Sequence, residues 1–240
     1  MFDPAGGDAE AERISRVYER YGSSPGRAAR YSAANLGNRA IVAERDRMVD
    51  AMLGRLGLLP LTGRRVLDVG SGFGHELARM GDLGARPADL VGVDLVPERV
   101  ERARLAYPAI DFRTGDGRAL DLPDDSVDVV LCYTLFSSIL DRPAARGIAA
   151  EIARVLKPGG ALVWYDMRYP SPANRNVRPI GADEIRAMFT TFGATIRSVT
   201  VLPPLARRLG SLTPAVYPAL ARVAPLRSHL LAALVKPGSR

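Results

Sequence analysis

The stretch Val66-Leu67-Asp68-Val69-Gly70-Ser71-Gly72-Phe73-Gly74 decides the fold of this 240-residue chain. A short apolar run ends in a turn with glycine at every second position, and helical spacing resumes at His75–Met80. Glycine lets the backbone turn tightly and approach a ligand where a Cβ would intrude. This strand–turn–helix pattern is typical of a nucleotide-binding α/β protein, and a plain strand-to-helix turn is the alternative.

Apolar runs and helical segments alternate from this turn onward. The expected strands are 65–70, 90–95, 110–114, 127–133, 161–166 and 195–202, and the later helices are 97–107, 143–156 and 182–192. KPGG at 157–160 is expected to stop a helix before the fifth strand. This order predicts βαβ units in a doubly wound, mostly parallel sheet, with helices on both faces because the strand interiors are apolar throughout.

We expect one domain over residues 1–240, because this length gives a sizeable core but is short for two ordinary domains. Residues 1–9 are expected to be disordered and 10–57 to form helices, broken at Gly22 to Gly26. The α/β core is expected over 60–202, a helical insertion over 203–228 and a last strand at 230–235.

Composition narrows the class of protein. Cys132 is the single cysteine and there are two histidines, so neither an internal disulfide nor a metal cluster is expected. The first ten residues are acidic where a secretory signal needs a basic start and an apolar run, and no apolar run reaches the ~18 residues of a membrane span. We therefore expect a cytoplasmic protein.

The positive charge is confined to the end of the chain. The net charge is +7, yet residues 1–184 carry 25 basic and 26 acidic residues, and no acidic residue follows Glu184. This basic segment predicts contact with a membrane surface or an anionic substrate, and a solvated helix face is the alternative. We expect no nucleic-acid partner, because no aromatic residues are interleaved with the basic ones.

Two carboxylates near the glycine turn indicate the ligand. Asp94 closes the second strand 20 residues after Gly74, where a carboxylate accepts hydrogen bonds from a ribose diol, or caps the helix at Pro97. Asp68 lies two residues before Gly70, where it would repel a pyrophosphate but tolerate an amino group and a sulfonium. Asp68 therefore argues against nicotinamide and flavin cofactors.

Four motifs together resemble the class I S-adenosylmethionine-dependent methyltransferases, of the methyltransferase type 11 kind. They are VLDVGSGFG at 66–74, VGVD at 91–94, Gly115-Asp116-Gly117 with LPDDSVDVV at 122–130, and KPGG at 157–160. The resemblance covers residues 60–202. It implies a seven-stranded sheet of order 3-2-1-4-5-7-6 with strand 7 antiparallel, in which 10–57 covers the site as a lid.

The resemblance also implies S-adenosylmethionine as the cofactor. Asp68 to Gly74 would hold its methionine moiety, Asp94 its ribose and Asp116 its adenine amino group, while Cys132 and Tyr133 would line the floor. The expected cofactor-binding residues are Asp68, Gly70, Ser71, Gly72, Gly74, Asp94, Leu95, Asp116, Gly117, Cys132 and Tyr133.

The acceptor side is less defined, because methyl transfer needs a general base only where the acceptor must lose a proton. His75, Tyr133 and Asp166 are the catalytic candidates, with packing or a contact to the donor as the alternative for His75 and the cofactor wall for Tyr133. His229 is expected to be structural. The candidate substrate-binding residues are Tyr31, Asn38, Arg168 and Tyr169.

The resulting prediction is methyl transfer from S-adenosylmethionine to a small molecule, with O-methylation slightly favoured and a natural-product, lipid or glycan intermediate as acceptor. A fold relative that binds the cofactor as a regulator or scaffold, or uses it without methylating, is the alternative. A nicotinamide-dependent oxidoreductase is disfavoured by Asp68 and by GxGxG in place of GxGxxG. Both a monomer and a homodimer fit the sequence.

Overall fold

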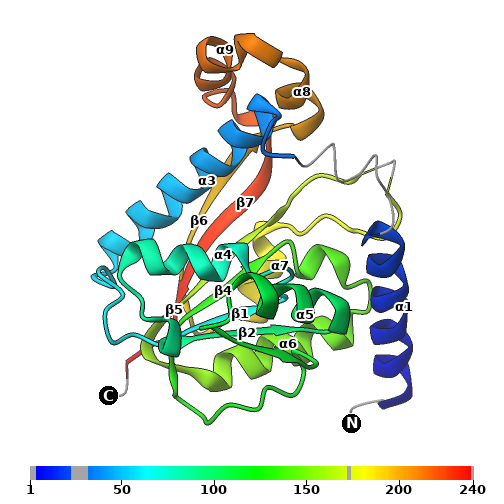
Figure 1. Cartoon of the computed structure of the whole chain (residues 1–240), viewed down its shortest axis with the longest axis vertical. Helices are drawn as coiled ribbons and strands as arrows, with labels where there is room; N and C mark the ends of the chain where they lie inside the picture. The colour runs from blue at the N-terminus through cyan, green and yellow to red at the C-terminus, as the bar shows by residue number, and fades with distance from the viewer. Residues whose placement is uncertain (1–3, 23–31, 172–173, 239–240) are drawn as a thin grey trace.

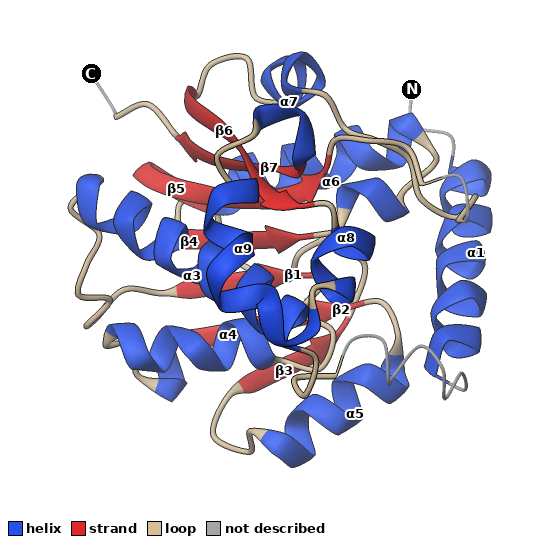
Figure 2. Cartoon of the chain, turned by 90° about the horizontal axis from the view of Figure 1, so that it is seen from above, coloured by secondary structure: helices blue, strands red, loops and turns tan. Residues whose placement is uncertain are grey.

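The computed structural model describes residues 4–22, 32–171 and 174–238, with side chains from Ala9 onward. Its centre is a seven-stranded sheet of order β3-β2-β1-β4-β5-β7-β6, and Figure 2 shows the strands side by side in this order. All neighbours pair in parallel except β7, which pairs antiparallel with both β5 and β6. The doubly wound sheet expected from the sequence is confirmed, including its strand order.

The strands and helices follow the expected alternation (Figure 1). The strands are β1 Val66–Val69, β2 Leu90–Asp94, β3 Asp111–Thr114, β4 Val127–Tyr133, β5 Leu156–Met167, β6 Gly193–Val201 and β7 Arg227–Val235. The helices are α1 Pro4–Gly22, α3 Leu36–Arg55, α4 His75–Arg79, α5 Pro97–Ala106, α6 Arg142–Val155, α7 Ala182–Met188, α8 Pro203–Arg208 and α9 Thr213–Leu220.

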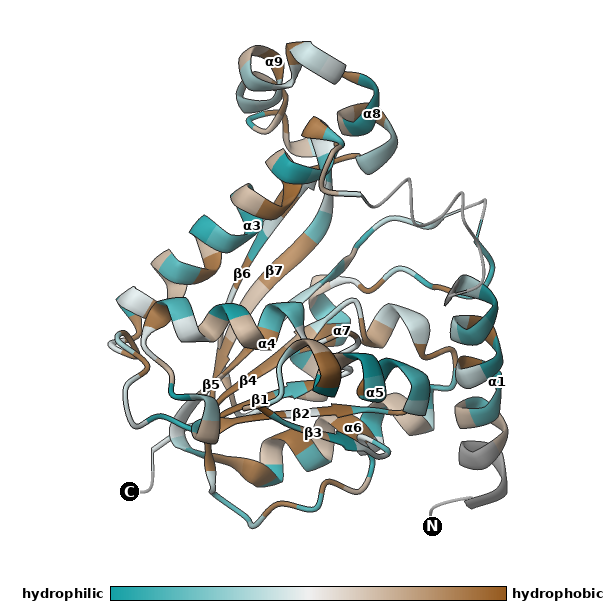
Figure 3. Cartoon of the chain, viewed as in Figure 1, coloured by the Kyte–Doolittle hydropathy of each residue, from teal (hydrophilic) through white to brown (hydrophobic). Residues whose placement is uncertain are grey.

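Two hydrophobic layers hold the helices on the sheet. One layer includes Ile148 of α6, Ile185 of α7 and Trp164 of β5, whose indole stacks on Phe136 with ring centroids 4.1 Å apart. The other layer joins α3, α4 and α5 to the opposite face. Figure 3 shows the central strands mostly in the hydrophobic colours. Since both faces of the sheet are covered, these strands are largely apolar, and Asp68 in β1 is a buried exception.

The amino-terminal helix corrects one expectation. Helix α1 begins at Pro4, whereas residues 1–9 were expected to be disordered, and residues 1–3 lie outside the described residues. The Glu10 carboxylate accepts a hydrogen bond from the Leu140 amide at 2.6 Å and pairs with Arg13 at 2.7 Å. These long-range contacts fasten α1 to the segment just before α6.

The KPGG motif corrects a second expectation from the sequence. Strand β5 begins at Leu156, so residues 157–160 lie within its bounds and not in a stop before it. The pairing of β4 with β5 shifts between Val127 and Val129, and Gly159 N and Gly160 O bond the backbone of Lys236. Hydrogen bonds with the residue that follows β7 therefore extend β5 to include the motif. Strand β7 begins at Arg227, three residues earlier than expected.

The insertion between β6 and β7 is helical, as expected, and residues 203–226 are here named the carboxy-terminal cap. It consists of α8, α9 and the 3₁₀ turns Gly210–Leu212 and Ala224–Leu226. Figure 1 places the cap at the far end of the β6–β7 hairpin, against the start of α3. Gly37 permits this contact: a Cβ on Gly37 would lie 2.2 Å from the carbonyl oxygen of Ala206.

Replacing Gly37 with alanine should lower the free energy of unfolding by about 2 kcal/mol or more, because a methyl group would press on backbone atoms that cannot rotate away. Urea unfolding measures the change. Gly54→Ala, in the same helix, is the matched control, since its Cβ would meet only Leu59 Cδ1 at 3.9 Å. The control should leave stability unchanged or raise it by up to about 1 kcal/mol. Equal effects of the two variants would contradict this account of the cap.

Candidate functional site

A cleft lies at the carboxyl ends of β1, β2 and β4, the usual place for a ligand in an open parallel sheet. Its polar half is lined by the glycine-rich turn, Arg45, Glu76 and Tyr133, among others. Its apolar half extends toward the turn after β3. Gly70, Asp94 and Leu95 border both halves, so the two form one continuous site.

The glycine-rich turn has the tight geometry that its sequence predicts. Gly70, Gly72 and Gly74 have φ values of +81°, +55° and +81°, in the left-handed region that favours glycine. A Cβ on Gly74 would lie 2.5 Å from Phe112 Cζ, and one on Gly72 would lie 3.1 Å from Arg99 Nη2. Glycine at these positions therefore allows the backbone of the turn to lie closer to the cleft than any residue with a Cβ would.

Asp94 holds this turn in place. Its carboxylate is buried and accepts hydrogen bonds from Gly72 N at 2.8 Å and Val96 N at 2.9 Å. Arg99 Nη1 lies 3.5 Å from the same carboxylate. The carboxylate borders both halves of the cleft, where it can also accept hydrogen bonds from a ligand diol.

Asp68 is the least compensated charge of the cleft. It is buried, lines the polar half and forms no hydrogen bond with any residue that the structure describes. Burial, aided by the charges of Glu76 and Asp94, raises the pKa of Asp68 well above its usual range. Three carboxylates in one cleft fit an ammonium and a sulfonium, and they oppose a pyrophosphate.

The apolar half has the lining expected of an adenine pocket. It is formed by Val69, Val93, Leu95, Leu135, Ile139, Ile148 and other residues. Asp116 and Gly117 lie at its edge, and a Cβ on Gly117 would come within 3.0 Å of Val69 Cγ1. The Asp116 carboxylate is oriented by Arg118, whose backbone N–H donates to it at 2.8 Å. A flat apolar nucleobase with one polar edge fits the apolar half of the cleft.

Helix α1 contributes side chains to the wall of the cleft. Ile14 lines both halves, and Tyr18 lines the polar half. The Tyr18 hydroxyl bonds the Ser138 hydroxyl at 2.8 Å, and the guanidinium of Arg99 lies over the Tyr18 ring at 4.5 Å. Helix α1 therefore borders the cleft, and the lid expected over 10–57 stays a prediction.

Arg45 is the functional residue that sequence reasoning missed. It lies buried on α3, with its guanidinium 2.6 Å from the Glu76 carboxylate and 5.0 Å and 5.6 Å from the ring centres of Tyr133 and Tyr165. Burial opposes its charge, but Glu76 and Asp46 hold its pKa above the usual range. Its position four residues after Ile41 and four before Val49 could have indicated an arginine on the buried helix face.

The three catalytic candidates occupy different environments. His75 lines the polar half but is exposed, and its Nδ1 bonds the Tyr107 hydroxyl at 2.8 Å. Tyr133 is part of the cleft wall, and burial raises its pKa, so its phenol stays protonated.

Asp166 lies behind the wall and not on it. Its carboxylate accepts hydrogen bonds from Ser137 N at 2.9 Å and Met167 N at 2.8 Å, and burial raises its pKa to about 6. It therefore positions the 3₁₀ turn Phe136–Ser138 beside the cleft and does not face a ligand.

Cys132 is a correction. Its side chain is buried in the layer under α6 and does not line either half of the cleft. Side chains alternate along a strand, so Tyr133 faces the cleft while Cys132 points to the opposite face. Burial raises the pKa of the Cys132 thiol.

Asn38, Arg168 and Tyr169, the acceptor candidates that the structure describes, do not line the cleft. Tyr31 lies outside the described residues. Asn38 lies in the capped first turn of α3, where the Asn35 side chain accepts a hydrogen bond from Asn38 N. Asn38 in turn accepts a hydrogen bond from Arg207 Nε at 2.8 Å, so its side chain holds the carboxy-terminal cap.

Arg168 and Tyr169 pack against each other, with the Arg168 guanidinium 4.6 Å from the Tyr169 ring centre. The Tyr169 hydroxyl donates to the carbonyl of Pro225 at 3.2 Å, again within the cap. The turn after β5 was interpreted as an acceptor contact because polar groups end the strand. The cap accounts for the polar contact of Tyr169, and the acceptor roles of Arg168 and Tyr169 stay predictions.

His229 has a structural environment, as expected. Its ring lies parallel to that of Tyr165 with centroids 4.8 Å apart, and its Nδ1 bonds the Ser228 hydroxyl at 2.9 Å. Burial lowers the pKa of His229 to about 4, with help from the charges of Arg207 and Arg45. The imidazole is therefore neutral at pH 7 and supports Tyr165, which lines the cleft.

Comparisons with known proteins agree with this site. The sequence model of a methyltransferase domain matches residues 66–160, from the glycine-rich turn to KPGG. A probable S-adenosylmethionine-dependent methyltransferase of Mycolicibacterium smegmatis is 30% identical over 139 residues, which are 55% of this chain and 52% of the relative. Phthiotriol/phenolphthiotriol dimycocerosates methyltransferase 1 of Mycobacterium ulcerans is 36% identical over 116 residues, or 45% of this chain and 39% of the relative.

The chain thus spans about half the length, or less, of these curated relatives. Among solved structures, an S-adenosylmethionine-dependent methyltransferase from Mesorhizobium loti superposes with a TM-score of 0.55 at 20% identity. The match covers 76% of this chain and 95% of that one. This likeness shows a common fold.

The buried His229 should make stability depend on pH. Its folded-state pKa of about 4 lies below the ordinary 6.5, so its contribution is complete above pH 6.5 and is lost as the pH falls toward 4. Between pH 7 and pH 5 the free energy of unfolding should fall by about 1–2 kcal/mol more in the wild type than in His229→Phe, which keeps the stacking on Tyr165. Urea unfolding at both pH values measures this, and equal falls in the two proteins would refute it.

Proposed function

We propose that this chain, whose residues 66–160 match the model of a methyltransferase domain, is a class I S-adenosylmethionine-dependent methyltransferase that transfers a methyl group from S-adenosylmethionine to a small-molecule acceptor. One observation carries the proposal: the uncompensated, buried Asp68 lies in the same cleft as an apolar pocket bordered by Asp94 and Asp116. A cation, a ribose and an adenine in one ligand match these three environments.

The proposed roles follow the cleft from its polar to its apolar half. Asp68, Gly70, Ser71, Gly72 and Gly74 would hold the methionine moiety, and the bound cofactor supplies a methyl group already activated on a sulfonium. Asp94 would accept hydrogen bonds from the ribose hydroxyls. Leu95, Asp116 and Gly117 would hold the adenine.

The chain's main task in such a transfer is to hold the acceptor in line and to exclude water. Tyr133 and Tyr165 form the wall near which the acceptor would bind, and Arg45 fixes both rings. Because its phenol stays protonated, Tyr133 would orient the acceptor by donating a hydrogen bond and would not remove its proton. His75, which lines the polar half, remains the proposed base for a hydroxyl acceptor.

The acceptor itself is proposed by class. O-methylation is slightly favoured over N- or C-methylation, with a natural-product, lipid or glycan intermediate as acceptor. The Mycobacterium ulcerans relative, named for a lipid substrate, supports a lipid most directly. The proposal also assigns contact with a membrane surface or an anionic acceptor to the basic segment after Glu184, and it includes a cytoplasmic location and either a monomer or a homodimer.

Calorimetric titration with S-adenosylmethionine, and separately with NADH, tests the cofactor. The wild type should bind the sulfonium compound with micromolar affinity and NADH far more weakly. Asp68→Asn and Asp94→Ala should each weaken binding by about 10–100-fold, the effect of losing one charged hydrogen-bonding partner. Asp183→Asn is the control, since Asp183 is fully exposed on α7 and should leave affinity unchanged.

The outcomes separate the alternatives. Tighter binding of NADH would refute the proposal in favour of an oxidoreductase. Binding of S-adenosylmethionine without methyl transfer to any of a broad set of hydroxyl, amine and lipid acceptors would favour a regulatory or non-methylating relative. Asp94→Ala also removes the acceptor of Gly72 N, so urea unfolding must show that the variant is folded.

A further inference from the structure

The carboxy-terminal cap presents an apolar surface to solvent. Residues 212–226 contain a single charged residue, Arg222. Helix α9 turns Thr213 and Tyr217 inward, and its exposed face is made of Pro214, Ala215, Pro218 and Ala219. On either side of this helix, Leu212 is 62% exposed and Val223 is 45% exposed. The surface formed by Leu212, Val223 and the exposed face of α9 is here named the apolar tip.

The fold does not require this surface to be apolar. The cap is fixed through its other side, where the Tyr217 hydroxyl donates to the Glu44 carboxylate at 2.6 Å and Ala206 packs on Gly37. Polar residues on the outer face of α9 would preserve every one of these contacts. Exposed apolar side chains grouped on one short segment are a feature that marks protein or membrane interaction sites.

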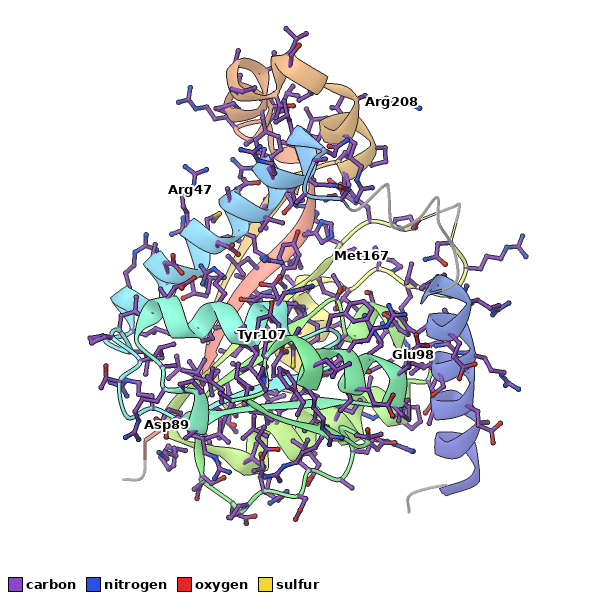
Figure 4. All side chains as sticks on the ribbon, viewed as in Figure 1. Arg47, Asp89, Glu98, Tyr107, Met167 and Arg208 are labelled. Atoms are coloured by element: carbon purple, nitrogen blue, oxygen red, sulfur yellow. The ribbon has the colours of Figure 1, made fainter. Side chains whose placement is uncertain are left out.

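Cations surround the apolar tip. Arg208 and Arg222 are exposed on the cap, and Arg39 is exposed at the start of α3 on which the cap packs. None of the three side chains forms a hydrogen bond or ion pair with the described residues. Figure 4 shows Arg208 projecting from α8 away from the rest of the molecule. No acidic residue follows Glu184, and the nearby Glu44 is already bonded to Tyr217 and Thr200 N. The surface therefore has a net positive potential.

We propose that the apolar tip docks on an anionic membrane surface. Leu212 and Val223 would enter the boundary between headgroups and acyl chains, while the arginines bind lipid phosphates. No helix in the described part of the chain is both long and apolar enough to cross a bilayer, so the contact is interfacial. A second copy is a poorer occupant, because a two-fold contact would set these arginines against their own copies.

The position of the cap means that docking would orient the cleft relative to the membrane. Helix α3 carries the cap at its start and supplies Arg45 to the cleft further along. Figure 2, which views the molecule from above, shows α8 and α9 over the central strands. A docked molecule would therefore hold the cleft at a fixed orientation to the bilayer. The docking itself depends only on the tip and stands apart from the proposed methyl transfer.

Co-sedimentation with vesicles tests the docking. The probes are vesicles of phosphatidylcholine alone and of phosphatidylcholine mixed with phosphatidylglycerol. The wild type should bind the mixed vesicles and show little binding to phosphatidylcholine, with binding weakened by added salt. The double variant Leu212→Asp/Val223→Asp and the double variant Arg208→Glu/Arg222→Glu should each lower the partition coefficient about tenfold or more.

Leu105→Asp is the matched control, because Leu105 is 84% exposed on α5 and lies outside the cap. It should bind vesicles as the wild type does. Calorimetry with S-adenosylmethionine shows whether each variant keeps its cleft, so failure of docking and failure of the proposed function are read separately. The proposal is overturned if the wild type ignores anionic vesicles, or if the tip variants bind them as the wild type does. It is also overturned if size-exclusion chromatography shows a wild-type dimer that the tip variants convert to monomers.

Discussion

The cleft depends on one buried interaction, the acceptance of two backbone N–H groups by the Asp94 carboxylate. Gly72 N comes from the turn after β1 and Val96 N from the turn after β2, so a single side chain fixes two adjacent connections at the edge of the sheet. The turn after β1 contains three glycines in left-handed conformations, and ordering such flexible residues costs conformational entropy that the tether offsets. Because the carboxylate binds the protein's own backbone, the two turns are held in place without a ligand.

The same edge concentrates negative charge, and the surrounding arginines balance it only in part. Arg45 is committed to Glu76 and Asp46, and Arg99 to Asp94 and the Tyr18 ring. Asp68 is left without a hydrogen-bonded partner among the described residues, in a place where burial penalises its charge. A cationic ligand relieves that penalty, whereas an anionic one increases it. Charge therefore selects among nucleotide-like ligands that the fold alone would accept.

The sequence predicts the parts of this site that depend on local pattern. Glycine spacing, strand length and the acids at strand ends are readable along the chain, and the turn at Gly70, the acid at Asp94 and the sheet order are found where they were expected. Contacts between distant segments were not readable. The polar residues Arg168 and Tyr169 were predicted to contact the acceptor, but Tyr169 bonds Pro225 of the cap. Cys132 was predicted to line the floor of the cofactor site, but the alternation of side chains along β4 places it in the core. Arg45 was missed because its partners Glu76, Tyr133 and Tyr165 come from three other elements.

Helix α3 links the two surfaces on which recognition depends. Its first turn packs on α8 through Gly37, its middle supplies Arg45 to the cleft, and Glu44, one residue before Arg45, accepts a hydrogen bond from Tyr217 of the cap. Adjacent residues on one rigid helix thus contact the cap and the cleft wall. A force on the cap is transmitted to the Arg45–Tyr133–Tyr165 wall through a single turn of helix, without a flexible linker between them. Contacts at the cap would therefore act first on this wall, whereas the tether at Asp94 joins the turns after β1 and β2.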